Sequence, residues 1–194
     1  NPTVDLFGTD LTAIVPLDFS GTTRSTSPTI GAWERASILT VEVYNGAVLL
    51  QKYPNLKGAF DKINKGSHTG SLIIKLTANT SETVQAKLNA SGTTSEGGTS
   101  NFTDVLIYPT VSGLKVSGSL NKALINLNGA DNVTFDGRVN ATGLTADLEF
   151  VNNQTGLNAV TIKLDSSARS NTIQYCTIKG GGGSSANGTI LFGT

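Results

Sequence analysis

The sequence contains few of the residues from which chemical sites are usually built. Its 194 residues include one cysteine, one histidine, one tryptophan and no methionine. A single cysteine excludes a disulfide within the chain, and a single histidine excludes metal sites that need two imidazoles. Charged residues make up only 14% and cancel to a net charge of zero. The chain therefore lacks the basic surface of a nucleic-acid-binding protein, and we expect no nucleic-acid partner, cofactor or metal.

Long hydrophobic runs are also missing. The sequence has no apolar stretch of transmembrane length and no signal peptide. It begins at Asn1 and ends on a strand-like segment, Thr189–Thr194. We interpret the sequence as a piece of a longer chain.

What the chain does have is short strands that recur at near-constant spacing. Four of them alternate apolar and polar residues and close on Gly: Leu114–Gly118, Leu124–Gly129, Val133–Gly137 and Cys176–Gly180. Recurring short strands with no helix between them predict an all-β coil of stacked turns, a parallel β-helix with three strands per turn.

We expect the strands of this β-helix to group into successive turns. The predicted first turn is Ser71–Leu76, Val84–Leu88 and Val105–Tyr108; the second is Leu114–Ser117, Leu124–Leu127 and Val133–Asp136; the third is Asp147–Val151, Val160–Leu164 and part of Ile173–Ile178; and Thr189–Phe192 begins a fourth. The Gly-, Ser- and Thr-rich stretches Ser91–Ser100, Asn140–Ala146 and Gly180–Asn187 are assigned to loops. Asparagines at strand ends are predicted to form corners: Asn128, Asn132, Asn152 and Asn171.

Two local patterns precede the repeats. Residues 38–50 suit a hairpin, with Asn45-Gly46 as the central pair of a type I′ turn. Residues 55–65 predict an amphipathic helix that ends at Gly66 in the left-handed conformation. We expect this helix to cap the open amino-terminal end of the β-helix, where unpaired backbone groups would otherwise invite association.

Three segments of the chain resemble β-helix modules of known surface proteins. They are Leu56–Gly70, Asn126–Arg138 and Asn171–Gly180, while Asp18–Glu34 is similar to the closing segment of such a module. The resemblance is to the right-handed, pectate-lyase-like parallel β-helix modules of large secreted adhesins of Bacteroidetes-type bacteria.

The resemblance implies a secreted or cell-surface location reached by type IX secretion. The secretion machinery, other surface proteins and glycans are then the possible partners, and no catalytic residue set is implied. The implied domains are a closing segment at 1–35, a linker and hairpin at 36–54, and the start of a β-helix module at 55–194.

Few residues are candidates for catalysis. The weak candidates are Asp136, Arg138 and Asp165, and we expect Asp165 to pair with Arg169 across a surface loop. Asp131 is predicted to make an Asx-type corner. His68 is predicted to serve a turn or a cap. Cys176, which the repeat aligns with Val133, is predicted to be a small buried side chain.

These observations favour a non-catalytic structural or adhesive segment of a large secreted bacterial surface protein. The alternative is a carbohydrate-active enzyme of the same architecture, a polysaccharide lyase or glycoside hydrolase, or its glycan-binding part. A third hypothesis, an ice- or surface-binding face made of threonine ladders, requires Thr134 and Thr177 to stack outward on one face.

Overall fold

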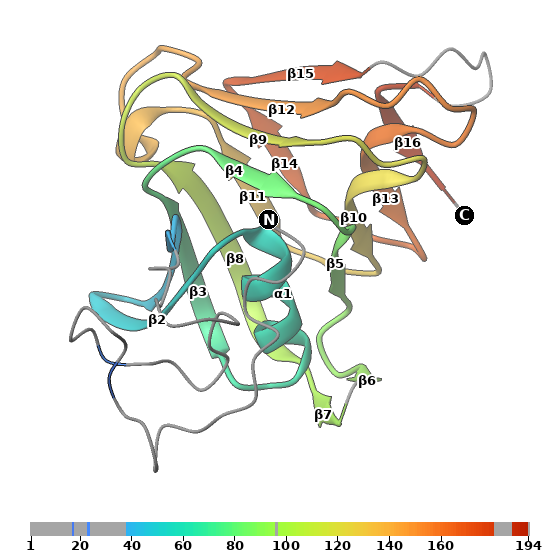
Figure 1. Ribbon diagram of the computed structural model, residues 1–194. Helices are drawn as coiled ribbons and strands as arrows, with labels where there is room; N and C mark the ends of the chain where they lie inside the picture. The colour runs from blue at the N-terminus through green and yellow to red at the C-terminus, as the bar shows by residue number, and fades with distance from the viewer. Residues whose placement is uncertain (1–16, 18–22, 24–37, 96, 181–187, 194) are drawn as a thin grey trace. The chain divides into compact units, whose positions relative to one another are not determined.

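The computed structural model describes residues 17, 23, 38–95, 97–180 and 188–193. The predicted closing segment 1–35, apart from Leu17 and Thr23, and residues 181–187 of the last predicted loop lie outside the described residues. Residues 39–194 form one compact unit. This unit is mostly β and contains parallel sheets, as the sequence predicts (Figure 1).

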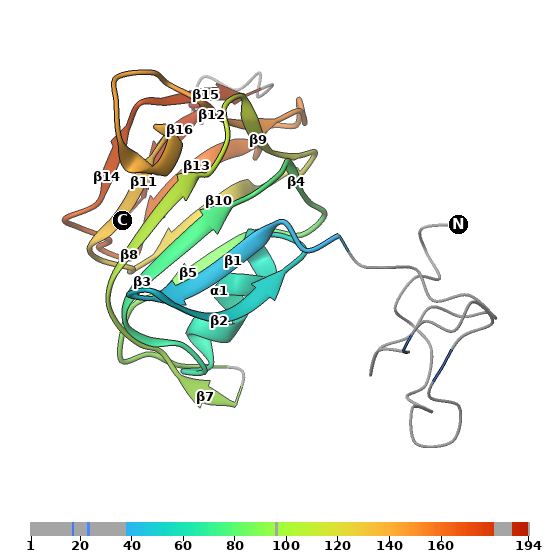
Figure 2. The ribbon, with the colours of Figure 1, turned by 90° about the vertical axis from the view of Figure 1, so that its left-hand side faces the viewer.

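Three sheets are built from strands that recur along the chain in the same order. The first sheet has the order β14-β11-β8-β3-β1-β2, the second β15-β12-β9-β4 and the third β16-β13-β10-β5. The chain crosses the three sheets in turn, so that β3, β4 and β5 are followed by β8, β9 and β10 in the same sheets. We call each such passage a turn. Figure 2 shows the successive strands side by side from β1 and β2 to β14.

The elements have the following bounds: β1 Val41–Asn45, β2 Val48–Tyr53, α1 Leu56–Asn64, β3 Thr69–Leu76, β4 Thr80–Glu82, β5 Ala86–Asn89, β6 Thr94–Ser95, β7 Gly98–Thr99, β8 Asn101–Pro109, β9 Leu114–Gly118, β10 Ala123–Asn128, β11 Val133–Asp136, β12 Leu148–Asn152, β13 Val160–Asp165, β14 Thr172–Gln174, β15 Cys176–Gly180 and β16 Ile190–Phe192. A short 3-10 helix, η2 (Val139–Ala141), follows β11.

The core consists of side chains that stack from one turn to the next. In the first sheet Ile74 pairs with Ile107 and Ile107 pairs with Phe135, and all three are fully buried. Phe135 also meets Phe150 of the second sheet edge to face, with ring centroids 5.3 Å apart. Each buried side chain of this size contributes about 1.5–3 kcal/mol to folding, so the columns are the main source of stability.

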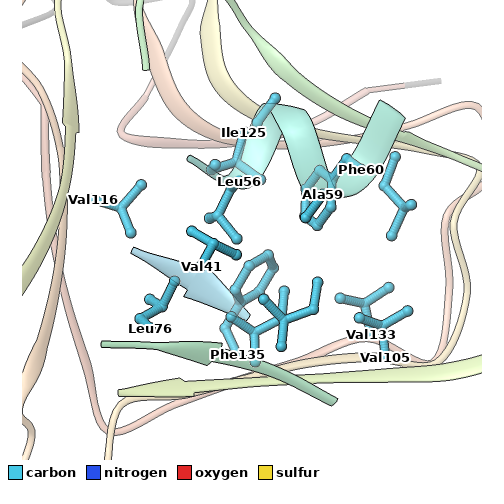
Figure 3. Close-up of a cluster of buried hydrophobic side chains, with 14 of the residues drawn as sticks. Val41, Leu56, Ala59, Phe60, Leu76, Val105, Val116, Ile125, Val133 and Phe135 are labelled. Carbon is cyan, nitrogen blue, oxygen red and sulfur yellow. The ribbon is translucent and has the colours of Figure 1, made fainter. Parts of the chain in front are cut away.

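Helix α1 closes the first turn on one side. Asn55 caps it by accepting a hydrogen bond from Gly58 N, and Gly66 ends it with φ at +70°. Its apolar stripe is buried, and Figure 3 shows Leu56, Ala59 and Phe60 on the side of the helix that faces Val41 and Leu76. The predicted helix and its position at the first turn are confirmed.

Each edge strand of the first turn finds a different partner. Strand β3 pairs with β1 in an antiparallel ladder. The buried carboxylate of Glu82, on β4, accepts hydrogen bonds from the first amides of α1, Leu56 N at 2.8 Å and Lys57 N at 3.1 Å. The free edge of β5 is covered by Asn64 of α1. The side-chain amide of Asn64 makes the hydrogen bonds that the backbone of a neighbouring strand would make. It donates to Lys87 O and accepts from Asn89 N, both at 2.8 Å.

The predicted hairpin is confirmed, but its predicted turn type is wrong. Asn45 pairs with Val48, so that Gly46 and Ala47 are the two central residues. Of these only Gly46 has a positive φ, +57°, which fits a type II′ turn because that turn needs a positive φ only at its first central residue. A register shift between Val43 and Tyr44 leaves Leu50 without a partner in the ladder.

The predicted second turn is confirmed, because its strands β9, β10 and β11 lie one in each of the three sheets. The predicted first turn is wrong, because Ser71–Leu76 and Val105–Tyr108 lie in β3 and β8, which are neighbours in the first sheet. The error arises at β4, Thr80–Glu82, which is short and polar and gives no apolar alternation. A second error is Ile173–Ile178, which is two strands, because Tyr175 adopts a φ of +52° and forms a corner between β14 and β15.

The corrected order changes two further predictions. Cys176 pairs with Leu148 in the second sheet, so it is not equivalent to Val133 of the first. Thr134 and Thr177 likewise lie in different sheets. They form no common threonine ladder, and the hypothesis of an ice-binding face built on them is wrong.

Asparagines stabilise the corners as predicted. Asn132 has a φ of +60°. Asn171 accepts from Val133 N and donates to Ala130 O, one turn away. Asn152 is almost fully buried, and its side chain accepts a hydrogen bond from Leu120 N and donates one to Val160 O. Asn128 instead bonds a side chain, donating to Asn89 Oδ1 at 2.9 Å. These contacts satisfy polar groups where the chain leaves one sheet for the next.

We predict that Asn64→Ala destabilises the protein by about 2–4 kcal/mol, because it leaves two buried backbone groups of β5 without partners. Urea unfolding followed by circular dichroism measures the change. The matched control is Asn153→Ala, because Asn153 is exposed and its loss should change the free energy of unfolding by less than about 0.5 kcal/mol. Equal effects in the two variants would contradict the assigned role of Asn64.

Candidate functional site

Two of the three predicted site residues lie together at the end of β11. Asp136 is the last residue of that strand and is only 2% exposed. Arg138 binds it side-on, with Nε donating to Oδ1 at 2.9 Å and the terminal nitrogen donating to Oδ2 at 2.6 Å. Arg138 N and Gln174 Nε2 donate to the same carboxylate at 3.0 and 2.8 Å. The carboxylate thus accepts four hydrogen bonds.

The electrostatics of this pair oppose acid–base catalysis. The Arg138 hydrogen bonds lower the pKa of Asp136 below its ordinary value, although burial opposes them. Asp136 in turn raises the pKa of Arg138. A carboxylate that stays ionised, is buried and accepts four hydrogen bonds is not available as a general acid or a nucleophile. Asp136 and Arg138 hold the chain in place instead.

The part they hold is the corner between β14 and β15. The guanidinium of Arg138 lies over the ring of Tyr175, with Cζ 4.6 Å from the centroid. Gly137 passes so close beneath this corner that a Cβ there would lie 1.8 Å from Tyr175 O. The sequence Asp136-Gly137-Arg138 therefore joins β11 to the next turn by the hydrogen bond from Gln174 to Asp136, by the cation–π contact of Arg138 with Tyr175 and by a backbone approach that only glycine permits.

The third candidate, Asp165, lies apart from this pair. It ends β13 in the third sheet, whereas Asp136 ends β11 in the first. Lys163 Nζ lies 2.6 Å from Asp165 Oδ2 and lowers the pKa of Asp165. Asp136 and Asp165 share no hydrogen-bond partner among the described residues. The structure does not bring the three candidates into one site.

The predicted pair of Asp165 with Arg169 is wrong. Arg169 contacts Asp131 instead: its backbone N donates to Asp131 Oδ1 at 2.8 Å, and Nε lies 3.4 Å from Oδ2. The reason is the stacking of turns, which places the loop after β13 over the loop after β10. Asp131 accepts its bond from the next turn, so it links two turns and does not form a local Asx-type corner.

His68 and Cys176 both serve the fold. His68 is 5% exposed and its Nε2 lies 2.5 Å from Tyr53 Oη, so it is a core residue more than a turn residue. Burial lowers the pKa of His68 and raises that of Tyr53 to about 12. Cys176 is partly buried, and burial raises the pKa of its thiol to about 12. A thiol that remains protonated at neutral pH is a poor nucleophile.

In the part of the chain that the structure describes, no three His, Cys, Asp or Glu side chains are grouped so that they could hold a metal ion. Within the same residues no helix has the length and apolar character needed to cross a membrane.

One surface feature was missed by the sequence analysis. A groove of about 350 Å³ lies on the outer face of the third sheet and includes Asn126 and Lys163. Asn126 is 7% exposed, and its Oδ1 is buried with no hydrogen-bond partner among the described residues. No sequence signal marks this groove, because it depends on which strands become neighbours in the third sheet.

Comparison with known proteins gives no further assignment. No family model, no curated protein and no solved structure matches this chain. Its function is therefore inferred from its own residues.

We predict that Asp136→Asn lowers the midpoint of thermal unfolding at pH 7 by about 3–6 °C, because it removes the charged bonds that hold the β14–β15 corner. Since the pKa of Asp136 is lowered on folding, its contribution is complete above about pH 4 and is lost as the pH falls through the lowered value. The difference between wild type and variant should therefore shrink below pH 4.

Scanning calorimetry between pH 2.5 and 7 tests this expectation. The control is Asp147→Asn, which removes a carboxylate that has no hydrogen-bond or ion-pair partner among the described side chains and should leave the midpoint at pH 7 unchanged. A difference for Asp136→Asn that stays constant down to pH 2.5 would contradict the assignment.

Proposed function

We propose that this chain is a segment of a right-handed parallel β-helix that serves as a non-catalytic structural or adhesive part of a large secreted bacterial surface protein. In this proposal the stacked turns form a stiff rod that presents loops, such as Ser91–Ser100, to the surroundings. Export by type IX secretion, and contacts with the secretion machinery or with other surface proteins and glycans, belong to the same proposal.

The observation that carries the proposal is the fixed order in which the chain crosses its three sheets. Leu114 pairs with Leu148 and Leu148 with Cys176 in the second sheet, while Ile125 pairs with Ile162 and Ile162 with Ile190 in the third. All of these pairs are parallel. Parallel strand pairs in three sheets that the chain visits in a constant order are the geometry expected of a solenoid, whose length grows by adding turns.

The state of the charged residues also favours a structural role. Arg138 donates two hydrogen bonds to the carboxylate of Asp136, and Lys163 forms an ion pair with Asp165. On the second sheet Glu149 lies between Lys115 at 3.0 Å and Lys179 at 2.5 Å. Side chains that join neighbouring strands in this way stiffen a sheet. A glycoside hydrolase of this architecture would instead need a pair of carboxylates facing one substrate.

We predict that antibodies raised against residues 39–194 label intact cells of the organism that encodes this chain. Immunogold electron microscopy of intact and permeabilised cells measures the labelling, and cells that lack the gene are the control. Labelling that appears only after permeabilisation would contradict a surface role.

The enzymatic alternative is tested separately with the purified chain. Incubated with acidic and neutral polysaccharides, it should release no reducing ends and no unsaturated sugars above the level of a heat-denatured sample. Product release that Asp136→Asn abolishes would support the enzyme over the rod.

A further inference from the structure

Three asparagines of this chain stand directly before a glycine. The pairs are Asn45-Gly46, Asn128-Gly129 and Asn187-Gly188. In an Asn-Gly pair the backbone N of the glycine can attack the side-chain carbonyl carbon of the asparagine, because glycine carries no side chain that would shield its nitrogen. Asn187 lies outside the described residues, so the structure compares the first two pairs.

The pair in the β1–β2 hairpin is open to this reaction. Asn45 and Gly46 are both exposed. Apart from its chain neighbours, a Cβ built on Gly46 would have no atom within 4 Å, so a ring that forms there meets no obstacle. The backbone N of Gly46 donates no hydrogen bond to the described residues. The Asn45 side chain is held by a single exposed hydrogen bond, from Nδ2 to Thr69 O at 3.0 Å.

The pair at the end of β10 is closed to the same reaction. Gly129 N donates to the backbone O of Asp165, on the next turn, at 2.9 Å. A Cβ on Gly129 would lie 3.1 Å from Ser166 O, so the space around the nitrogen is filled. The Asn128 amide is held at both ends, since it donates to Asn89 Oδ1 and accepts from Ser166 Oγ, each at 2.9 Å. Stacked turns therefore protect this asparagine.

We propose that Asn45 is a site of spontaneous deamidation, and that the reaction loosens the hairpin that covers the edge of β3. Gly46 N loses its proton to solvent and bonds to Asn45 Cγ. The Cγ–Nδ2 bond breaks, and Nδ2 leaves as ammonia after taking a proton from water. Water then opens the resulting succinimide. Addition at Cγ gives aspartate, and addition at the backbone carbonyl carbon of Asn45 gives isoaspartate, in which the main chain runs through the former side chain.

Both products remove the contact that fixes the hairpin turn to the start of β3. A carboxylate replaces the amide that donates to Thr69 O, and it brings a negative charge close to that carbonyl oxygen. Isoaspartate also lengthens the main chain at the position where β1 pairs with both of its neighbours, because Asn45 is aligned with Val48 of β2 and with Leu72 of β3. The ends of both ladders should therefore open.

The test incubates the purified 194-residue chain at pH 8 and at pH 6, then measures conversion by trypsin digestion and mass spectrometry. Peptide 36–52 contains Asn45 as its only asparagine, and peptide 123–138 contains Asn128. Asn45 should convert about tenfold or more faster than Asn128, because the hydrogen bonds around Gly129 must first open. Conversion should be faster at pH 8, where the backbone N loses its proton more readily. In urea, which removes the protection by the fold, the two asparagines should convert at similar rates.

Two variants connect the reaction to the hairpin. Asn45→Gln keeps a side-chain amide but would have to close a larger ring, so it should not convert. After incubation the thermal midpoint of the wild type should fall by about 2–4 °C, whereas that of Asn45→Gln should stay constant. Asn45→Asp reproduces one product and should show the lower midpoint before any incubation.

Equal conversion of Asn45 and Asn128 in the folded chain would overturn the proposal, as would an Asn45 that stays intact while the sample in urea converts. Aspartate without isoaspartate would also overturn it, because a succinimide opens at either carbonyl. An equal fall in the midpoint of incubated wild type and of Asn45→Gln would reject the loosening of the hairpin.

Discussion

The structure depends on closing the free edges of its first turn. A parallel strand that begins a sheet leaves a row of N–H and C=O groups without partners, and such an edge recruits other chains. Here β1 pairs with β3, Glu82 bonds the first amides of α1, and Asn64 bonds both free groups of β5 that face it. Once these groups have hydrogen-bond partners, the strands of each later turn pair with the strands of the turn before. The buried apolar side chains of the core can then stack from turn to turn without a further capping element.

This constraint separates the interior from the surface. The interior columns are uniform and permit little change, whereas loops and outward side chains are free to differ between turns. Asp136 and Arg138, which the sequence marks as possible catalytic residues, belong to the structural part because they hold the corner at Tyr175. The groove around Asn126 belongs to the surface part, where an unsatisfied polar atom is tolerated at some cost in stability.

The sequence predicts the elements that depend on residues close together in the chain. It does not predict which distant strands become neighbours. Helix α1 is visible because its apolar spacing and Gly66 lie within one short segment. Strand β4 is missed because Thr80 and Glu82, both buried, look like loop residues. For the candidate site, Asp136 and Arg138 are found because they are two residues apart. The partner of Arg169 and the setting of Asn126 are set by register between turns, which no local pattern contains.

The most direct test of this account is the pattern of cross-strand contacts in solution, measured by nuclear Overhauser spectroscopy on the labelled protein. The account predicts parallel contacts that link Leu106 to Thr134 and Thr134 to Thr172, together with a contact between the Asn64 side-chain amide and the Asn89 backbone N–H. Antiparallel contacts between Hα protons of β8 and β11, or an Asn89 amide that exchanges freely with solvent, would contradict it.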